Sequence, residues 1–258
     1  MTTIDEELDW GHLREAAERG GAREVARVVF QRDAETRRAL WRLALRRFDD
    51  RESPLRNFEL LIDIAQAGID DSMTLANQAE DADAAAQWAD AANVLSYNLS
   101  AALADCWPDD PAPRERHHFE VGLRAAEDCV RWRWELEKPS DRRAMGYWAA
   151  GMHHLSLGHL AEAWGGFSTA ERLVRGDAKG GHGAGVTPGG DFGVILYHGY
   201  AGIARWLMGD DEGRRDFERA CRAFEETYTR DTERKEDAQF GLEQLRWVEK
   251  KFILAVKS

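Results

Sequence analysis

The sequence predicts an all-α protein of about eleven helices, arranged as stacked antiparallel hairpins. Helix-forming residues dominate the composition, and only six prolines occur in 258 residues. Apolar residues recur at helical spacing along most of the chain, and no window has the alternating pattern of a half-buried strand. A stretch with the pattern of a helical hairpin, residues 147–170, is followed by a degraded copy about fifty residues later.

Sequence signals for helix ends divide the first half of the chain. Thr3 and Glu6 form a capping-box pattern, and Gly20-Gly21 is a stop signal. Asp33 is an expected N-cap, and Ser53-Pro54 has the serine cap and first-turn proline of another helix start. The helices expected from these signals span residues 3–19, 22–31, 34–48, 53–68 and 70–105, the last with a break near residues 81–83.

Five arginines lie along the expected helix 34–48. Such a row could bind an acidic ligand, but acidic residues nearby nearly balance its charge, so a solvated helix face is the favoured interpretation. The residues of the row are Arg37, Arg38, Arg42, Arg46 and Arg47.

A proline-rich segment, residues 107–113, interrupts the helical pattern. Three prolines within it forbid a helix and indicate a rigid connection. It could separate two domains, residues 1–106 and 114–258. Helices of the same kind resume directly afterwards, at residues 118–137, so a long loop within one continuous array is the favoured interpretation.

Residues 147–170 carry the clearest local pattern, two helices that meet near Gly158. Small residues at Ala150, Gly151 and Ala163 would let the two helices approach closely. A copy follows at a nearly constant offset. Gly151 and Gly158 correspond to Gly202 and Gly209, each 51 residues on, and Phe167 and Ala170 correspond to Phe217 and Ala220, each 50 residues on.

This pattern of aromatic, small and glycine positions resembles the tetratricopeptide repeat. The resemblance implies an α-solenoid in which the first helix of each hairpin lines a peptide-binding groove, and the last helix, residues 231–257, caps the array. The groove positions implied by the resemblance are Trp148, Met152, Leu155, Leu196, Tyr200, Ile203 and Trp206.

The implied lining is apolar and aromatic, which suits an apolar or amphipathic partner segment. The family's carboxylate clamp needs Lys, Arg and Asn at such positions, and these are absent here. The alternative, which the sequence leaves open, is that these side chains only pack on neighbouring helices.

Composition narrows the function classes. A net charge of −12 argues against general attraction to nucleic acid or to anionic lipid, and no apolar stretch approaches membrane-spanning length. Three isolated cysteines fit a reducing cytoplasm. We therefore expect a cytoplasmic protein- or peptide-binding adaptor without a cofactor, and the sequence leaves its oligomeric state open.

Two other functions stay open. The glycine-rich residues 175–191 could close a pocket of a ligand-sensing regulator, although a flexible linker is the default interpretation. A metal-dependent all-α enzyme is less favoured. Glu115 and His118 have metal-ligand spacing but no second such pair, and His154 is expected in the hairpin core. The acidic group that imitates the aspartate-rich motif of prenyl-transferring enzymes consists of Asp210, Asp211 and Asp216.

Overall fold

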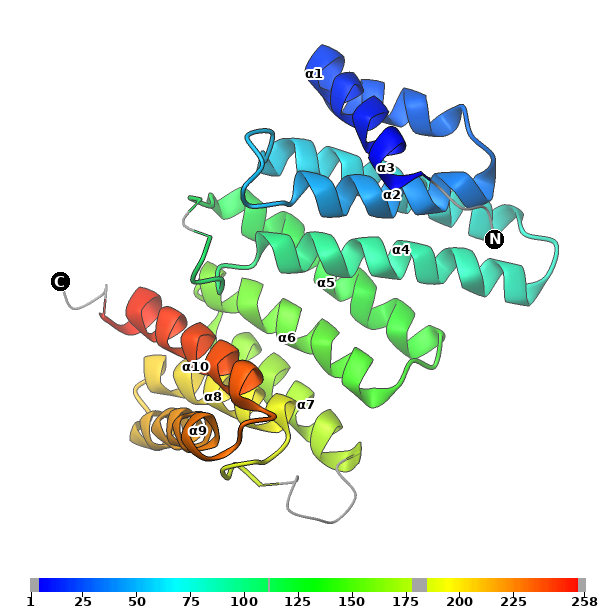
Figure 1. Cartoon of the computed structure of the whole chain (residues 1–258). Coiled ribbons are helices and arrows are strands. Elements are labelled where there is room, and N and C mark those ends of the chain that lie inside the picture. The colour runs from blue at the N-terminus through cyan, green and yellow to red at the C-terminus, as the bar shows by residue number, and fades with distance from the viewer. Residues whose placement is uncertain (1–4, 111, 178–184, 255–258) are drawn as a thin grey trace. The chain divides into compact units, whose positions relative to one another are not determined.

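The computed structural model describes residues 5–110, 112–177 and 185–254. Over these ranges the chain forms ten α-helices and a final π-helical turn, and they contain no strand (Figure 1). The helices divide into two compact units, Met1–Leu103 and Ala104–Ser258. The all-α prediction is therefore confirmed, with ten α-helices in the described part of the chain rather than about eleven. No helix of this part is both long and apolar enough to cross a bilayer.

The N-terminal unit contains four helices. They are α1 (Glu6–Phe30), α2 (Ala34–Phe48), α3 (Phe58–Gln78) and α4 (Ala82–Leu103). α3 packs along α4, and α2 packs against both. Asp33 caps α2 as predicted, since its side chain accepts a hydrogen bond from the backbone N–H of Thr36. The expected break near residues 81–83 is also present, between the end of α3 and the start of α4.

Glycines at two places in the N-terminal unit explain why observed helix ends differ from the predicted ones. Gly20 and Gly21 leave helical geometry as predicted, with Gly21 at φ 62°, but the two expected helices join across this kink as α1. Gly68 was predicted to end a helix and does not. A Cβ at Gly68 would lie 2.9 Å from Leu95 and 3.0 Å from Trp41, so this glycine serves close packing inside α3.

The predicted helix start at Ser53-Pro54 is wrong. These residues belong to a turn, and α3 begins at Phe58 behind the N-cap Asn57, whose side chain accepts from the backbone N–H of Leu60. The predicted Thr3 cap lies outside the described residues, and Asp5 caps α1.

Several arginines of α2 form ion pairs within the N-terminal unit. Arg46 and Arg47 pair with Glu6 and Glu7 and so tie α2 to α1. Arg37 pairs at 3.3 Å with the buried carboxylate of Asp71, which also accepts a hydrogen bond from the Trp41 indole at 3.0 Å. The carboxylate of Asp71 thus joins α2 to α3 inside the core.

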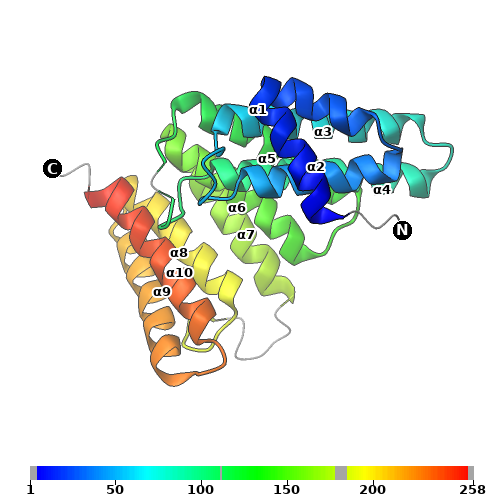
Figure 2. The same cartoon turned by 45° about the horizontal axis from the view of Figure 1, so that its top comes forward.

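The C-terminal unit contains six helices. They are α5 (Arg116–Glu135), α6 (Ser140–Leu157), α7 (Leu160–Asp177), α8 (Phe192–Leu207), α9 (Asp211–Arg230) and α10 (Lys235–Glu249), followed by the π-helical turn η2 (Lys250–Leu254). Consecutive helices pack side by side, and α10 packs on both α8 and α9 (Figure 2). Residues 104–110 and 112–115, before α5, are not helical, as the prolines of this segment predict.

The hairpin α6–α7 and the hairpin α8–α9 share one packing device. A Cβ at Gly151 would lie 2.7 Å from the ring of Phe167, and a Cβ at Gly202 would lie 2.7 Å from the backbone nitrogen of Phe217. Gly158 and Gly209 follow the first helix of each pair with φ of 81° and 86°, a conformation that favours glycine. The offset found in the sequence therefore corresponds to equivalent positions in two helix pairs.

Candidate binding face

The structure places six of the seven predicted groove residues in the core of the C-terminal unit. Trp148 and Leu196 are each 5% exposed, and Tyr200 is fully buried. Trp206 is half-buried, packs on Phe217 with ring centroids 6.1 Å apart, and lies under the guanidinium of Arg214. The other fully or nearly buried members are Met152, Leu155 and Ile203.

Helix α10 and the segment before α5 cover these residues. The phenol of Tyr200 donates a hydrogen bond to Gln244 of α10 at 2.9 Å, and burial raises the pKa of this phenol well above its usual value. A Cβ at Gly199 would lie 2.7 Å from Leu245, so α10 and α8 are in close contact there. The indole of Trp107 packs edge-on against Trp148 at 6.0 Å.

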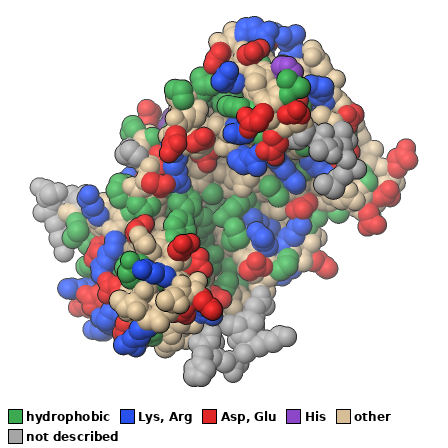
Figure 3. Space-filling view, viewed as in Figure 1, with side chains coloured by type: hydrophobic (Ala, Val, Ile, Leu, Met, Phe, Trp, Pro, Cys, Tyr) green, Lys and Arg blue, Asp and Glu red, His purple; other side chains and the backbone are tan. Residues whose placement is uncertain are grey.

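Five aromatic side chains form a row that is buried at both ends, at Trp148 and Phe224, and reaches the surface at Phe240. We call the row Trp148, Trp107, Phe240, Phe192 and Phe224 the aromatic face. Successive ring centroids are 6.0, 6.3, 6.5 and 5.6 Å apart, and the rings of Phe240 are stacked on those of both neighbours. Phe240 is 46% exposed. Hydrophobic side chains gather over α6 and along α10 in the space-filling view (Figure 3).

A pocket of about 480 Å³ lies at the end of the aromatic face, where α8 begins. Phe192 and Phe224 belong to both the face and the pocket, and Ile195 and Ala238 complete its apolar wall. Its volume is within the range of about 300–1,000 Å³ typical of ligand pockets. The face therefore offers an exposed ring beside a recess that could take an apolar side chain.

The pocket's polar wall comes from the end of the glycine-rich segment. The hydroxyl of Thr227 accepts a hydrogen bond from the backbone N–H of Gly189 at 2.8 Å, and the guanidinium of Arg234 donates to the carbonyls of Gly189 and Gly190. Asp191 caps α8. Residues 178–184, the middle of the glycine-rich segment, lie outside the described residues.

Two carboxylates and the guanidinium of Arg234 line this recess. Asp191 and Asp237 line the pocket. Glu236 and Glu243 are exposed on α10, one turn before and one turn after Phe240, so they flank its ring along the helix.

Comparisons with profiles of known protein families, with characterised proteins and with solved structures find no significant match to this chain.

The histidines considered as metal ligands lie in different local settings. The Nδ1 atom of His118 accepts a hydrogen bond from the backbone N–H of Glu115 at 2.9 Å, which closes a capping box at the start of α5. The Nδ1 atom of His154 lies 3.5 Å from that of His159, and burial lowers the pKa of His154.

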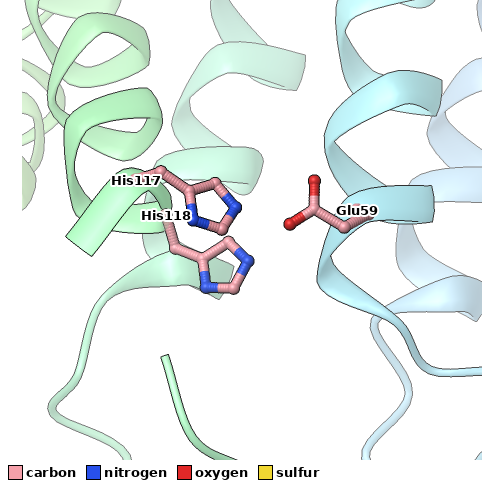
Figure 4. Close-up of side chains that lie close together, drawn as sticks. All are labelled: Glu59, His117 and His118. Atoms are coloured by element: carbon pink, nitrogen blue, oxygen red, sulfur yellow. The ribbon is translucent and has the colours of Figure 1, made fainter. Parts of the chain in front are cut away.

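Figure 4 places His117 and His118 side by side on the first turn of α5. Glu59, also labelled there, belongs to α3 of the N-terminal unit.

The three aspartates near the α8–α9 turn have electrostatic and capping roles. Asp210 caps α9 and pairs with Arg205, and Asp211 follows in the first turn. Asp216 pairs with Arg205 at 3.0 Å. Its carboxylate also lies 3.4 Å from the imidazole of His198. The imidazole's other nitrogen lies 3.1 Å from Glu171, a bridge between α7, α8 and α9 that the sequence did not predict.

Proposed function

We propose that this chain is a protein- or peptide-binding helical-repeat protein, an adaptor or scaffold with tetratricopeptide-like hairpins, rather than an enzyme. The aromatic face carries the proposal. Phe240 keeps nearly half of its surface exposed, and its ring packs near those of Trp107 and Phe192. Aromatic side chains beside a recess often dominate the binding free energy of an interface.

The predicted groove residues enter this proposal mainly as the support of the face. Trp148 contacts Trp107 directly, and Tyr200 lies behind Trp148 with ring centroids 6.4 Å apart. An apolar or amphipathic segment is the partner that suits such a surface, because a helix can present one apolar face to the row. The acidic groups near the α8–α9 turn agree with a non-catalytic role, since Arg205 neutralises Asp210 and Asp216.

Affinity capture from the native host tests the proposal. Phe240→Ala should remove the captured partner or weaken its binding by at least about tenfold, as expected for an interface hot spot. Trp164→Ala is the matched control, because Trp164 is 44% exposed on α7 and belongs to no part of the aromatic face. Circular dichroism should give the same helical content for both variants. Identical capture by wild type and Phe240→Ala would contradict the proposal.

A ligand-sensing regulator is the second candidate, and the pocket favours it. Residues 189–191 of the glycine-rich segment form part of the pocket wall, as a ligand-covering loop would. Mass spectrometry of molecules released from freshly purified protein distinguishes the two functions. A stoichiometric small molecule would favour the sensor, and partner capture that depends on Phe240 would favour the adaptor. A cytoplasmic location belongs to the main proposal, and three buried thiols agree with it.

A further inference from the structure

We infer that the partner segment is basic as well as apolar: a helix-forming peptide that places an apolar side chain against Phe240 and the pocket, and Lys or Arg on either side of it. The inference rests on the proposed function and adds the chemical class of the partner.

Among the residues that the structure describes, the acidic groups of α10 around Phe240 have no ion-pair partner. Glu236 and Asp237 form no ion pair with any residue that the structure describes, and Glu243 accepts only a hydrogen bond from Gln239 at 2.8 Å within the same part of the chain. Glu236 and Glu243 precede and follow the exposed ring by one helical turn. A partner side chain on Phe240 would therefore have a carboxylate on both sides.

The cations nearest in sequence are already engaged. The guanidinium of Arg234 donates to the carbonyls of Gly189 and Gly190 in the pocket wall. The ammonium of Lys235 lies 4.8 Å from the centre of the Tyr228 ring. Arg246 pairs with Glu225 and Glu249. The ammonium of Lys250 lies 5.8 Å from the centre of the Trp247 ring, and Lys251 pairs with Asp105. These contacts leave the charges of Arg234 and Lys235 in place, but the carboxylates of Asp191, Glu236, Asp237 and Glu243 outnumber them, so the edge of the face carries a net negative charge.

An apolar centre with an acidic edge favours a basic partner segment over an acidic one or a second copy of this chain. A partner's Lys or Arg would meet these carboxylates across the edge, which favours encounter and fixes the register of the bound segment. An acidic segment would meet like charge. A second copy of this chain is disfavoured for the same reason, because each copy carries a net charge of −12 and the same acidic edge.

Two synthetic peptides of 18 residues test the inference. The first is an amphipathic helix of Leu and Lys, and the second has Glu at every Lys position. Each is labelled with a fluorophore and titrated with the full chain at 50 mM and 300 mM NaCl, and anisotropy gives the Kd. We expect the Lys peptide to bind at least tenfold more tightly than the Glu peptide at low salt, with the difference reduced at high salt.

Charge-reversal variants test whether the acidic residues beside Phe240 bind the Lys peptide. The double variant Glu236→Lys/Glu243→Lys should weaken the Lys peptide by roughly tenfold. The control Glu127→Lys/Glu162→Lys changes the net charge equally, at two exposed positions on α5 and α7, and should leave the Kd within about twofold. Circular dichroism and thermal unfolding confirm that both double variants fold.

The outcomes separate the inference from the proposed function. Equal binding of the two peptides, or equal weakening by both double variants, overturns the basic partner. If that equal binding is still lost in Phe240→Ala, the proposed function stands without the charge preference. If Phe240→Ala changes neither peptide binding nor capture from the host, the proposed function falls and the inference falls with it.

Discussion

The close approach of α8 and α9 at Gly202 gives the sharpest test of the fold. A Cβ at this position would lie 2.7 Å from the backbone nitrogen of Phe217 and 2.8 Å from the carbonyl oxygen of Gly213. Ordinary contact begins at 3.4 Å, so in Gly202→Ala the two helices must separate by roughly 0.7 Å. Backbone atoms cannot rotate out of the way as a side chain can, so the whole helix pair has to adjust.

The expected loss follows from two opposing terms. Overpacking costs about 1–3 kcal/mol, and alanine returns up to about 1 kcal/mol because it is a better helix former than glycine. Because the obstruction is backbone, we take the upper end of the first term and expect a net loss of about 2 kcal/mol. Guanidinium-induced unfolding followed by far-ultraviolet circular dichroism measures this loss as a change in the free energy of unfolding.

Gly165→Ala is the matched control. Gly165 lies within α7 of the same unit, and a Cβ there would meet nothing within 4 Å. Only the helix-propensity term applies, so this variant should gain about 0.5–1 kcal/mol. The two substitutions should therefore differ by roughly 3 kcal/mol. Equal or greater stability of Gly202→Ala relative to Gly165→Ala would refute the close packing of α8 on α9.

Two further predictions concern buried polar groups. Asp71→Ala leaves the Trp41 indole and Arg37 without their acceptor, so the free energy of unfolding should fall by about 2–4 kcal/mol in the same assay. The control Asp70→Ala changes an exposed neighbour and should alter it by no more than about 0.5 kcal/mol. Equally small losses in both variants would show that the buried carboxylate is dispensable. Burial raises the pKa of Cys129 to about 11 and that of Cys221 to about 12. Iodoacetamide at pH 8 should therefore label these thiols at least about 100-fold faster in the unfolded chain than in the native one, because the thiolate is the reacting form. Equal labelling rates would contradict the burial of these thiols.

Local signals account for what the sequence could predict. The similar close packing in the two helix pairs was detectable because each glycine and its phenylalanine partner lie within one helical hairpin, as Gly151 and Phe167 do. The left-handed turns at Gly158 and Gly209 are also local. Gly68 misled because a helix stop and a close-packing position call for the same residue, and only the neighbours Trp41 and Leu95 distinguish them.

Contacts between segments that are distant along the chain account for the features that the sequence could not predict. The burial of Tyr200 depends on Gln244, and the packing of Trp148 depends on Trp107 from the segment before α5. Helical spacing identifies which residues share a face, but it does not reveal which later helix covers that face. The aromatic face was missed for the same reason. Phe240 was expected only to help cap the array, and its contacts with Trp107 and Phe192 need the folded unit.

The exposure of Phe240 favours a role in binding a partner over a role in stabilising the fold of α10. Gln239 and Glu243 give α10 a polar outer surface, while Leu245 and Val248 are buried against the unit. A half-exposed ring between those polar residues contributes less burial than a core side chain, so its removal should cost stability little. The neighbouring rings nevertheless hold it in a fixed position, which reduces the entropy lost when a partner binds. That combination suits an interface anchor better than a core residue, and it is why Phe240 distinguishes the adaptor from a purely structural helix.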